Sequence, residues 1–405
     1  MPTKERMHLP TEILVDIANA LYMTRESTEP RMEFLRQQDM YNFCLVSRQW
    51  YRAGIACLYR QPQLFGGNRF ALFAGTICPP SRKKKPTLEL GSMVESLWLD
   101  KLVHHSSNSV TARLLSRTHK SLVEFVAPRV SFSSVGLLTI FKAKTNVVHR
   151  LNGLTALSKC RKLRFLNLSL VDSRSISFPS LKKAISNLSS LKGLHLPKRI
   201  PPTKTHWSDG EWPTSLTSIR IGGRLNSDVM RRFEWPFFLE ELTLSQCKDL
   251  DVVLFESILA GEHLGRSLKR LVICSDNEDQ VQYDATDALL SLSKLTSLEV
   301  TADILSVLTP FLDDDSKLPL RELTILRGKV DQAWELEFFE YLRDALSLCL
   351  SSLLLLKIPK SAAKALPEIM CQEVDDIIQG HLEEIPDDEL DDMVLEDVGL
   401  IQYDG

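Results

Sequence analysis

The sequence predicts an α/β protein in which a small helical N-terminal domain precedes a curved solenoid with parallel strands inside and helices outside. Two observations lead to this prediction. A short apolar pattern recurs ten times after residue 93, and the first 61 residues carry a different, helical pattern. The chain has 405 residues, of which 44% are hydrophobic and 25% are charged, and these proportions are typical of folded proteins.

The repeated unit is a hexamer with apolar residues at its first, fourth and sixth positions. Its last two apolar positions lie two residues apart, which is the period of a strand that buries one face. One hexamer is a weak signal in a leucine-rich chain, but ten at a mean spacing of about 29 residues indicate a structural repeat with thirty core positions. The ten copies begin at Val94, Leu122, Leu163, Leu191, Leu216, Leu239, Leu268, Leu295, Leu320 and Leu353.

The segments between hexamers are long enough to form a helix and return to a parallel neighbouring strand. Four of them carry apolar residues at three- and four-residue intervals, as an amphipathic helix does. These four segments are 228–233, 251–259, 287–292 and 334–342. The hexamers resemble leucine-rich repeats, and this resemblance implies a domain of about ten repeats over residues 93–360.

The fuller signature of leucine-rich repeats adds a polar residue or Cys at the ninth position. This chain has Cys247, Asp276 and Asp303 there in three successive repeats, and the position is irregular elsewhere. A further hexamer-like run at 135–140 starts only 13 residues after Leu122. That interval is too short for a full repeat, so we expect the run to belong to a return helix.

The first 61 residues carry short helices with apolar faces. Ile13, Ile17 and Leu21 share one predicted helix face, and Val46 and Trp50 begin a second. About fifty residues arranged in this way bury little surface alone. We therefore expect the region to need a partner, although a cap over the first strand of the solenoid would also account for its apolar residues.

The Leu-Pro-x-Glu-Ile sequence that begins at Leu9 is followed by Leu-Val-Ser-Arg-x-Trp at 45–50. Together these motifs resemble an F-box, the adaptor-binding module of SCF-type cullin–RING ubiquitin ligases, over residues 9–61. The resemblance implies a Skp-type adaptor as partner, and a solenoid cap would not account for the Leu-Pro opening. Seventeen residues separate Leu21 from Asp39, more than the family usually has, so we expect an exposed insertion after Leu21. The matching adaptor-facing or adjacent core positions are Leu9, Pro10, Ile13, Ile17, Leu21, Leu45, Val46 and Trp50.

An F-box followed by leucine-rich repeats resembles a substrate receptor, which recruits a protein for ubiquitylation while other subunits perform the chemistry. Side chains that alternate with the buried ones face the inner surface of the solenoid, where a substrate would bind. A surface that binds a phosphorylated segment is expected to carry clustered Arg and Lys, and only two arginines on this face meet that expectation. The loop 200–213, with Trp207 and Trp212, either binds a partner or folds back onto the solenoid. The strand-face candidates are Trp98, Phe165, His195, Arg220 and Arg270.

Charge separates the body of the chain from its C-terminal end. The formal net charge is −3, yet residues 368–405 contain fourteen Asp or Glu and no Lys or Arg. We expect 361–405 to be an acidic tail, partly helical or disordered, which either extends into solvent or lies against the basic body. The connecting segment 62–92 contains the basic run 82–85, which is either a solvated linker or a nuclear-import signal.

Several classes of function are not expected from the sequence. It contains none of the common motifs for phosphate, dinucleotide, zinc-protease or α/β-hydrolase chemistry, so we expect neither enzyme activity nor a cofactor. Eight scattered cysteines lack metal-ligand spacing, which predicts reduced thiols and no metal site.

No apolar run reaches the ~20 residues that cross a bilayer, and no secretory signal begins the chain, so we expect a soluble protein of the cytoplasm or nucleus. Nucleic-acid binding is not expected, because positive charge is not gathered into a stripe with aromatic residues.

Three functions are compatible with these features. The chain is a substrate receptor of an SCF-type ligase, an interaction scaffold that binds the adaptor without directing degradation, or a solenoid binder with no ligase connection. Adaptor binding separates the third function from the first two. Reconstituted ubiquitylation separates the first from the second.

Overall fold

A computed structural model describes residues 9–23, 30–66, 68–79, 88–102, 108–128, 153–171, 176, 178–198, 211–248, 250–261, 263–277, 286–301, 318–326, 336–348, 350–364, 367–383 and 398–403. They belong to two compact units, Met1–Leu191 and Lys192–Gly405. The predicted basic run 82–85, the hexamer-like run 135–140, Trp207 and Asp303 lie outside the described residues.

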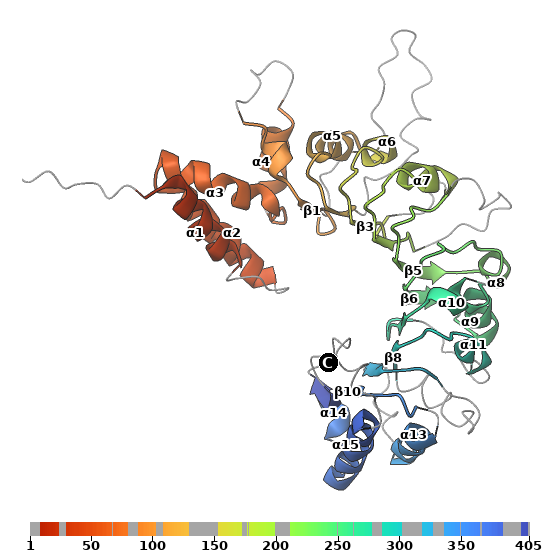
Figure 1. Cartoon of the computed structure of the whole chain (residues 1–405). Helices are drawn as coiled ribbons and strands as arrows, with labels where there is room; N and C mark the ends of the chain where they lie inside the picture. Colours follow the sequence, from red (N-terminus) through yellow and green to blue (C-terminus); the bar gives the residue numbers. More distant parts are fainter. Residues whose placement is uncertain are drawn as a thin grey trace, which may run out of the picture. The chain divides into compact units, whose positions relative to one another are not determined.

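The first unit begins with a bundle of three helices, α1 (Thr11–Met23), α2 (Pro30–Leu45) and α3 (Arg48–Arg60) (Figure 1). Buried residues of α1 recur every four positions, so they form one stripe against the other two helices. Gly54 allows α2 and α3 to approach closely, because a Cβ there would lie 2.6 Å from the ring of Phe43. The bundle core consists of Leu14, Ala18, Tyr22, Met40, Phe43, Ala53 and Cys57.

The rest of the first unit alternates strands with helices. Strands β1, β2 and β3 pair in parallel, in the order in which they occur along the chain. The elements are α4 (Arg69–Ile77), η1 (Leu90–Met93), β1 (Ser96–Trp98), α5 (Asn108–Thr118), β2 (Glu124–Val126), α6 (Gly153–Leu157), β3 (Phe165–Asn167) and α7 (Phe178–Ile185).

The second unit repeats the same arrangement, and each of its strands pairs in parallel with the next one. Its strands lie along one side and helices α8, α9, α11 and α13 along the other (Figure 1). The strands are β4 (Gly193–His195), β5 (Ser218–Arg224), β6 (Glu241–Lys248), β7 (Arg270–Ile273), β8 (Ser297–Thr301), β9 (Glu322–Leu326), β10 (Leu355–Pro359) and β11 (Gly399–Tyr403). The helices are α8 (Ser227–Met230), α9 (Val252–Leu259), α10 (Leu264–Ser267), α11 (Thr286–Leu290), α13 (Leu336–Leu348), α14 (Lys360–Ala363) and α15 (Glu368–Glu383).

The predicted repeat is confirmed at every hexamer. A strand begins at the third position of each of the ten hexamers, and all thirty apolar positions are at most 2% exposed. Pairing keeps the hexamers in register, so that Leu242 on β6 lies beside Ile219 on β5 and Leu271 on β7. A layer of aliphatic side chains between parallel strands and outer helices is the core of an α/β solenoid.

The four predicted return helices are also present. They correspond to α8, α9, α11 and α13, with bounds that differ from the prediction by a few residues. Asp251 caps the start of α9, because its carboxylate accepts a hydrogen bond from the backbone N–H of Leu254 at 2.7 Å.

Asp276 at the ninth position of its repeat and the residue after it both contact the end of β6. Asp276 accepts the exposed N–H of Gln246 at 2.9 Å, while the neighbouring Asn277 makes the buried contacts. The Asn277 side chain accepts the N–H of Cys247 at 2.8 Å and donates to the carbonyl of Leu244 at 3.2 Å. Asn277, one position after the ninth, therefore satisfies backbone groups where β6 ends.

The second unit does not end at residue 360, where the sequence placed the end of the repeats. Helix α15 buries Met370, Val374, Ile378 and His381 along one face, and β11 adds a parallel strand to β10. Asp375 of α15 accepts the N–H of Leu400 at 2.7 Å and so joins this helix to β11. The acidic count of this segment obscured its apolar face, because charged residues occupy only the outer positions of an amphipathic helix.

The hydroxyl of Tyr403 on β11 donates to the carbonyl of Ile325 on β9 at 2.9 Å. Burial, with a smaller contribution from Glu299, raises the pKa of Tyr403 above that of an ordinary tyrosine. We expect Tyr403→Phe to lower the free energy of unfolding by about 1 kcal/mol, because a carbonyl loses its partner. Chemical denaturation would measure this change. Tyr51→Phe on α3 is the control, and an equal effect of both substitutions would contradict the prediction.

Cys57 and Cys247 are buried free thiols that pack within the apolar core as small hydrophobic residues do. Burial raises the pKa of the Cys247 thiol to about 12, which keeps it protonated. Among the described residues, no helix combines the length and the apolar character needed to cross a membrane.

Candidate functional site

The eight predicted adaptor residues divide into two groups. Leu9, Leu21 and Trp50 are partly buried and pack against the core of the three-helix bundle. The remaining five side chains are exposed, although four of them are aliphatic and the fifth is proline. These exposed residues are Pro10, Ile13, Ile17, Leu45 and Val46, and we call them the adaptor face.

The start of α1 is held against α3 by one side chain. Gln49 donates from Nε2 to the carbonyl of Leu9 at 2.7 Å and lies 3.5 Å from the hydroxyl of Thr11. The ring centroid of Trp50 lies 4.6 Å from that of Phe43, so Trp50 anchors the start of α3 to α2. The Leu-Pro motif and the Trp motif, 40 residues apart in sequence, thus share one end of the bundle.

The junction of α2 and α3 exposes two aliphatic residues, Leu45 at 64% and Val46 at 61%. The sequence placed Val46 and Trp50 on one continuous helix, and this prediction is wrong. Helix α2 ends at Leu45, and Ser47 caps α3 by accepting the N–H of Trp50 at 3.4 Å. Ser is a strong N-cap residue, so it begins a new helix and leaves Val46 in the turn.

The exposed insertion that the sequence suggests after Leu21 covers residues 24–31. Helix α1 ends at Met23, before this insertion, and helix α2 begins at Pro30 and so includes its last two residues. Residues 24–29 lie outside the described part of the chain.

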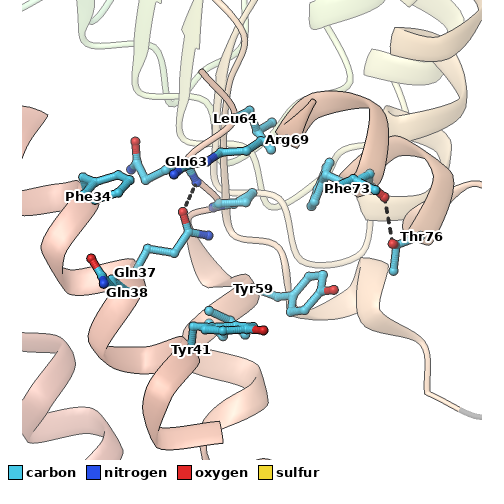
Figure 2. Close-up of a pocket in the computed structure, with 13 residues that line it drawn as sticks. Phe34, Gln37, Gln38, Tyr41, Tyr59, Gln63, Leu64, Arg69, Phe73 and Thr76 are labelled. Carbon is cyan, nitrogen blue, oxygen red and sulfur yellow. Dashed lines mark hydrogen bonds between the residues drawn. The ribbon is translucent and has the colours of Figure 1, made fainter. Parts of the chain in front are cut away.

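A groove that sequence reasoning missed lies between the bundle and α4. It encloses a cavity of about 560 Å³ with aromatic walls (Figure 2). Gln37 on α2 accepts the backbone N–H of Gln63 at 2.9 Å, and this bond holds the chain after α3 against α2. The sequence treated 62–92 as a connecting segment, although Phe70, Phe73 and Ile77 recur at the three- and four-residue spacing of a helix.

On the strand face of the first unit, Trp98 and Phe165 do not form one aromatic patch. Trp98 on β1 is 37% exposed, and Phe165 on β3 is half-buried. Strand β2 separates them, and the register places Val126 beside Trp98 but Glu124 beside Phe165. The two rings therefore occupy different rows of the sheet, two strands apart.

On the strand face of the second unit, His195 and Arg220 are direct neighbours on β4 and β5. Burial, reinforced by the Arg220 charge, lowers the pKa of His195 to about 4. Arg220 donates to the hydroxyl of Ser245 at 2.5 Å, and that hydroxyl donates to the carboxylate of Asp276 at 3.0 Å. The Arg220 charge is thus linked through Ser245 to a nearby carboxylate.

Two more basic side chains on this strand face also lie beside carboxylates. Arg270 forms an ion pair with Glu299, and Lys357 forms one with Glu322 at 2.8 Å. Burial alone would raise the pKa of Glu322, but hydrogen bonds from Lys357 and Ser297 outweigh it and lower the pKa. Arg220 and Arg270 lie on β5 and β7 with β6 between them, so they do not form a cation cluster.

Trp212, the described tryptophan of the predicted binding loop, folds back onto its own unit. Its indole N–H donates to the carbonyl of Glu234 at 2.7 Å, and its ring lies 6.0 Å from that of Phe233. Of the two roles that the sequence left open for this residue, the structure supports the packing role.

The lowered pKa of His195 has a consequence for stability. The unfolded chain takes up a proton near pH 6.5, whereas the folded chain does so only near pH 4. Stability contributed by neutral His195 is therefore complete above pH 6.5 and declines as the pH falls toward 4. When the pH falls from 7 to 4.5, we expect the unfolding free energy of wild type to drop by about 2 kcal/mol more than that of His195→Gln. Denaturant titrations at both pH values would measure this, with His263→Gln as control, and identical pH dependence of wild type and His195→Gln would refute it.

No protein-family model matches the chain. It is 26% identical over 265 residues to the F-box protein YDR306C of Saccharomyces cerevisiae, an alignment that covers 65% of this chain and 50% of that protein. It is 28% identical over 202 residues to the protein pof5 of Schizosaccharomyces pombe, covering 50% of each. The chain thus spans about half the length of the curated relatives that it matches.

One similar solved structure is the leucine-rich repeat-containing protein LegL7 of Legionella pneumophila. The TM-score is 0.42 with 14% sequence identity, covering 70% of this chain and 86% of that one. The fold assignment rests on the strand register and the buried hexamers rather than on this likeness.

A three-helix bundle that carries the Leu-Pro and Trp motifs precedes parallel strands built on a leucine-rich hexamer. In these features, and in its identity to an F-box protein of Saccharomyces cerevisiae, the chain resembles an F-box protein with leucine-rich repeats.

Proposed function

We propose that the chain is the substrate-recognition subunit of an SCF-type cullin–RING ubiquitin ligase. In this proposal the F-box binds a Skp-type adaptor and the leucine-rich repeats bind a protein substrate. The observation that supports it most is the adaptor face, where the aliphatic side chains of Ile13, Leu45 and Val46 are exposed outside the packed core of the bundle. Large aliphatic side chains that are exposed in a folded bundle are typical of a protein-binding surface.

The chain would contribute proximity rather than chemistry. A receptor that holds a substrate beside the ligase raises the local concentration of its lysines near the conjugating enzyme. The RING subunit and the conjugating enzyme that it recruits would then supply the chemistry.

The strand face of the second unit supports one refinement of the substrate class. Arg220 is linked to Asp276 through Ser245, and Arg270 is paired with Glu299. A receptor for a multiply phosphorylated segment needs several cations directed at one anion. We therefore propose a substrate recognised through mixed polar contacts, with acidic and basic groups matched to these pairs.

Two measurements test the proposal. The purified chain and a purified Skp-type adaptor should elute together from a sizing column, and addition of cullin and RING subunits should give an active ligase. A chain that ignores the adaptor would be a solenoid binder without a ligase connection. A chain that binds the adaptor but neither assembles with cullin nor promotes substrate ubiquitylation would be a scaffold.

A further inference from the structure

The groove between the bundle and α4 has the size and the lining of a binding pocket. Aromatic side chains converge on it from separate elements, with Phe34 and Tyr41 on α2, Tyr59 on α3 and Phe73 on α4 (Figure 2). Its volume of about 560 Å³ lies within the range of pockets that hold ligands or anchoring side chains. Leu72 also lines the groove and is 69% exposed, so an apolar rim is open to solvent.

The α2 wall of the groove continues onto the adaptor face. Phe34, Gln38, Tyr41 and Leu45 follow one another at intervals of four, three and four residues, which places them on one side of α2. Phe34, Gln38 and Tyr41 line the groove, and the next position, Leu45, belongs to the adaptor face. A protein docked on Leu45 can therefore reach the groove along a single helix.

The charge of the groove indicates what it would accept. Among the described residues that line it, Arg69 carries the only formal charge. Its guanidinium lies 4.6 Å from the ring centroid of Phe34, at the edge of the aromatic wall. An apolar cavity beside a cation suits a segment with a large apolar side chain next to a carboxylate.

We propose that the Skp-type adaptor, when bound to the adaptor face, inserts an apolar segment with an acidic side chain into this groove. The inference rests on the proposed function and extends it, because α4 then becomes part of the adaptor interface. The apolar side chain of the adaptor would contact Tyr41, Tyr59 and Leu72, and its carboxylate would pair with Arg69. A three-helix bundle offers little area by itself, so the groove would bring the interface closer to the size of a stable complex.

The test is the dissociation constant of the full chain for a purified Skp-type adaptor from the same organism. We expect Leu72→Asp to weaken binding about tenfold or more, because it places a carboxylate on an apolar rim next to an acidic segment. We expect Arg69→Glu to weaken binding by about three- to tenfold at low salt and by less at high salt, as an ion pair near the surface requires. Ile369→Asp is the matched control, since Ile369 is an equally exposed aliphatic residue (73%) on α15 of the other unit, and its affinity should equal that of wild type.

The outcomes separate this inference from the proposed function. If wild type binds the adaptor and both groove variants bind equally well, the groove proposal is overturned and the proposed function stands. If wild type does not bind the adaptor, the proposed function itself fails. If the groove variants abolish self-association in sedimentation without changing adaptor affinity, a second copy of the chain occupies the groove and the proposal is overturned. If Leu72→Asp lowers the unfolding temperature, the adaptor affinity of Arg69→Glu tests the groove proposal instead. Arg69 is exposed, so its replacement should leave the chain folded.

Discussion

Replacement of Leu45 by Asp is expected to abolish adaptor binding while the chain stays folded. In the free protein the Leu45 side chain is 64% exposed at the end of α2, so a carboxylate there would remain hydrated. In the proposed complex the same carboxylate would be buried against apolar groups, and an unpaired buried charge is strongly unfavourable. We expect the dissociation constant to rise at least about a hundredfold, which corresponds to roughly 3 kcal/mol.

The experiment measures adaptor affinity by titration calorimetry together with the unfolding temperature of each variant. Val253→Asp is a suitable control, because Val253 is an exposed aliphatic residue on α9 of the second unit. Ile13→Asp on α1 tests a second part of the adaptor face. Wild-type affinity for Leu45→Asp at an unchanged unfolding temperature would remove Leu45 from the interface.

The second large effect is expected at Gly223 on β5. This residue has φ of +84°, a conformation that side chains other than Gly rarely adopt. A Cβ at this position would lie 1.2 Å from the carbonyl oxygen of Lys198, which is backbone and cannot rotate away. Strand β5 changes register against β6 between Ile221 and Gly223. This irregular backbone brings Gly223 close to the carbonyl of Lys198. We expect Gly223→Ala to cost about 3 kcal/mol or more in unfolding free energy.

Gly66 supplies the matched control for this prediction. It has almost the same φ, +86°, but a Cβ there would meet nothing within 4 Å. Gly66→Ala should therefore lower the free energy of unfolding by only about 1 kcal/mol, the cost of a side chain at positive φ. Denaturant unfolding of both variants separates strain in the backbone from loss of space. Equal losses in the two variants would show that the contact with Lys198 is not what requires glycine.

Most of the repeat architecture could be predicted from the sequence, because its cause is local. A strand that buries one face requires apolar residues two apart, and this requirement recurs in every repeat. Leu242, Leu271 and Leu298 occupy the same position of three successive hexamers, and all three are buried on paired strands. The return helix that begins after Asp251 was predictable for the same reason, since its cap and its apolar face lie within ten residues.

The last repeat was not predicted because two local signals disagreed. The segment after residue 360 is dominated by acidic residues, and this composition favours a solvated tail. Helix α15 nevertheless buries Val374 and Ile378, and Gln402 stands in β11 where the preceding strand has Ile358. An edge strand has a neighbour on one side only, so it folds with fewer apolar residues than the pattern demands.

The candidate site was only partly predictable. The motifs at Leu9 and Trp50 indicated an F-box, but they did not show which of their residues pack inside the bundle. Helical spacing alone placed Val46 on the same helix as Trp50, whereas Ser47 ends that continuity. The groove beside α4 depends on how Phe34 and Phe73, 39 positions apart, are brought to one cavity, and periodicity carries no such information.

By itself, the sequence determined the repeat, the thirty buried positions and the F-box motifs, because each depends on residues close together in the chain. Only the tertiary structure decided which apolar residues of the bundle stay exposed, how α4 completes a groove, and how acidic segments still form the last repeat. It also decided that Arg220 and Arg270 are matched by nearby carboxylates. The physical reason is that burial and charge pairing arise between neighbours in space, and the fold selects these neighbours from distant parts of the chain.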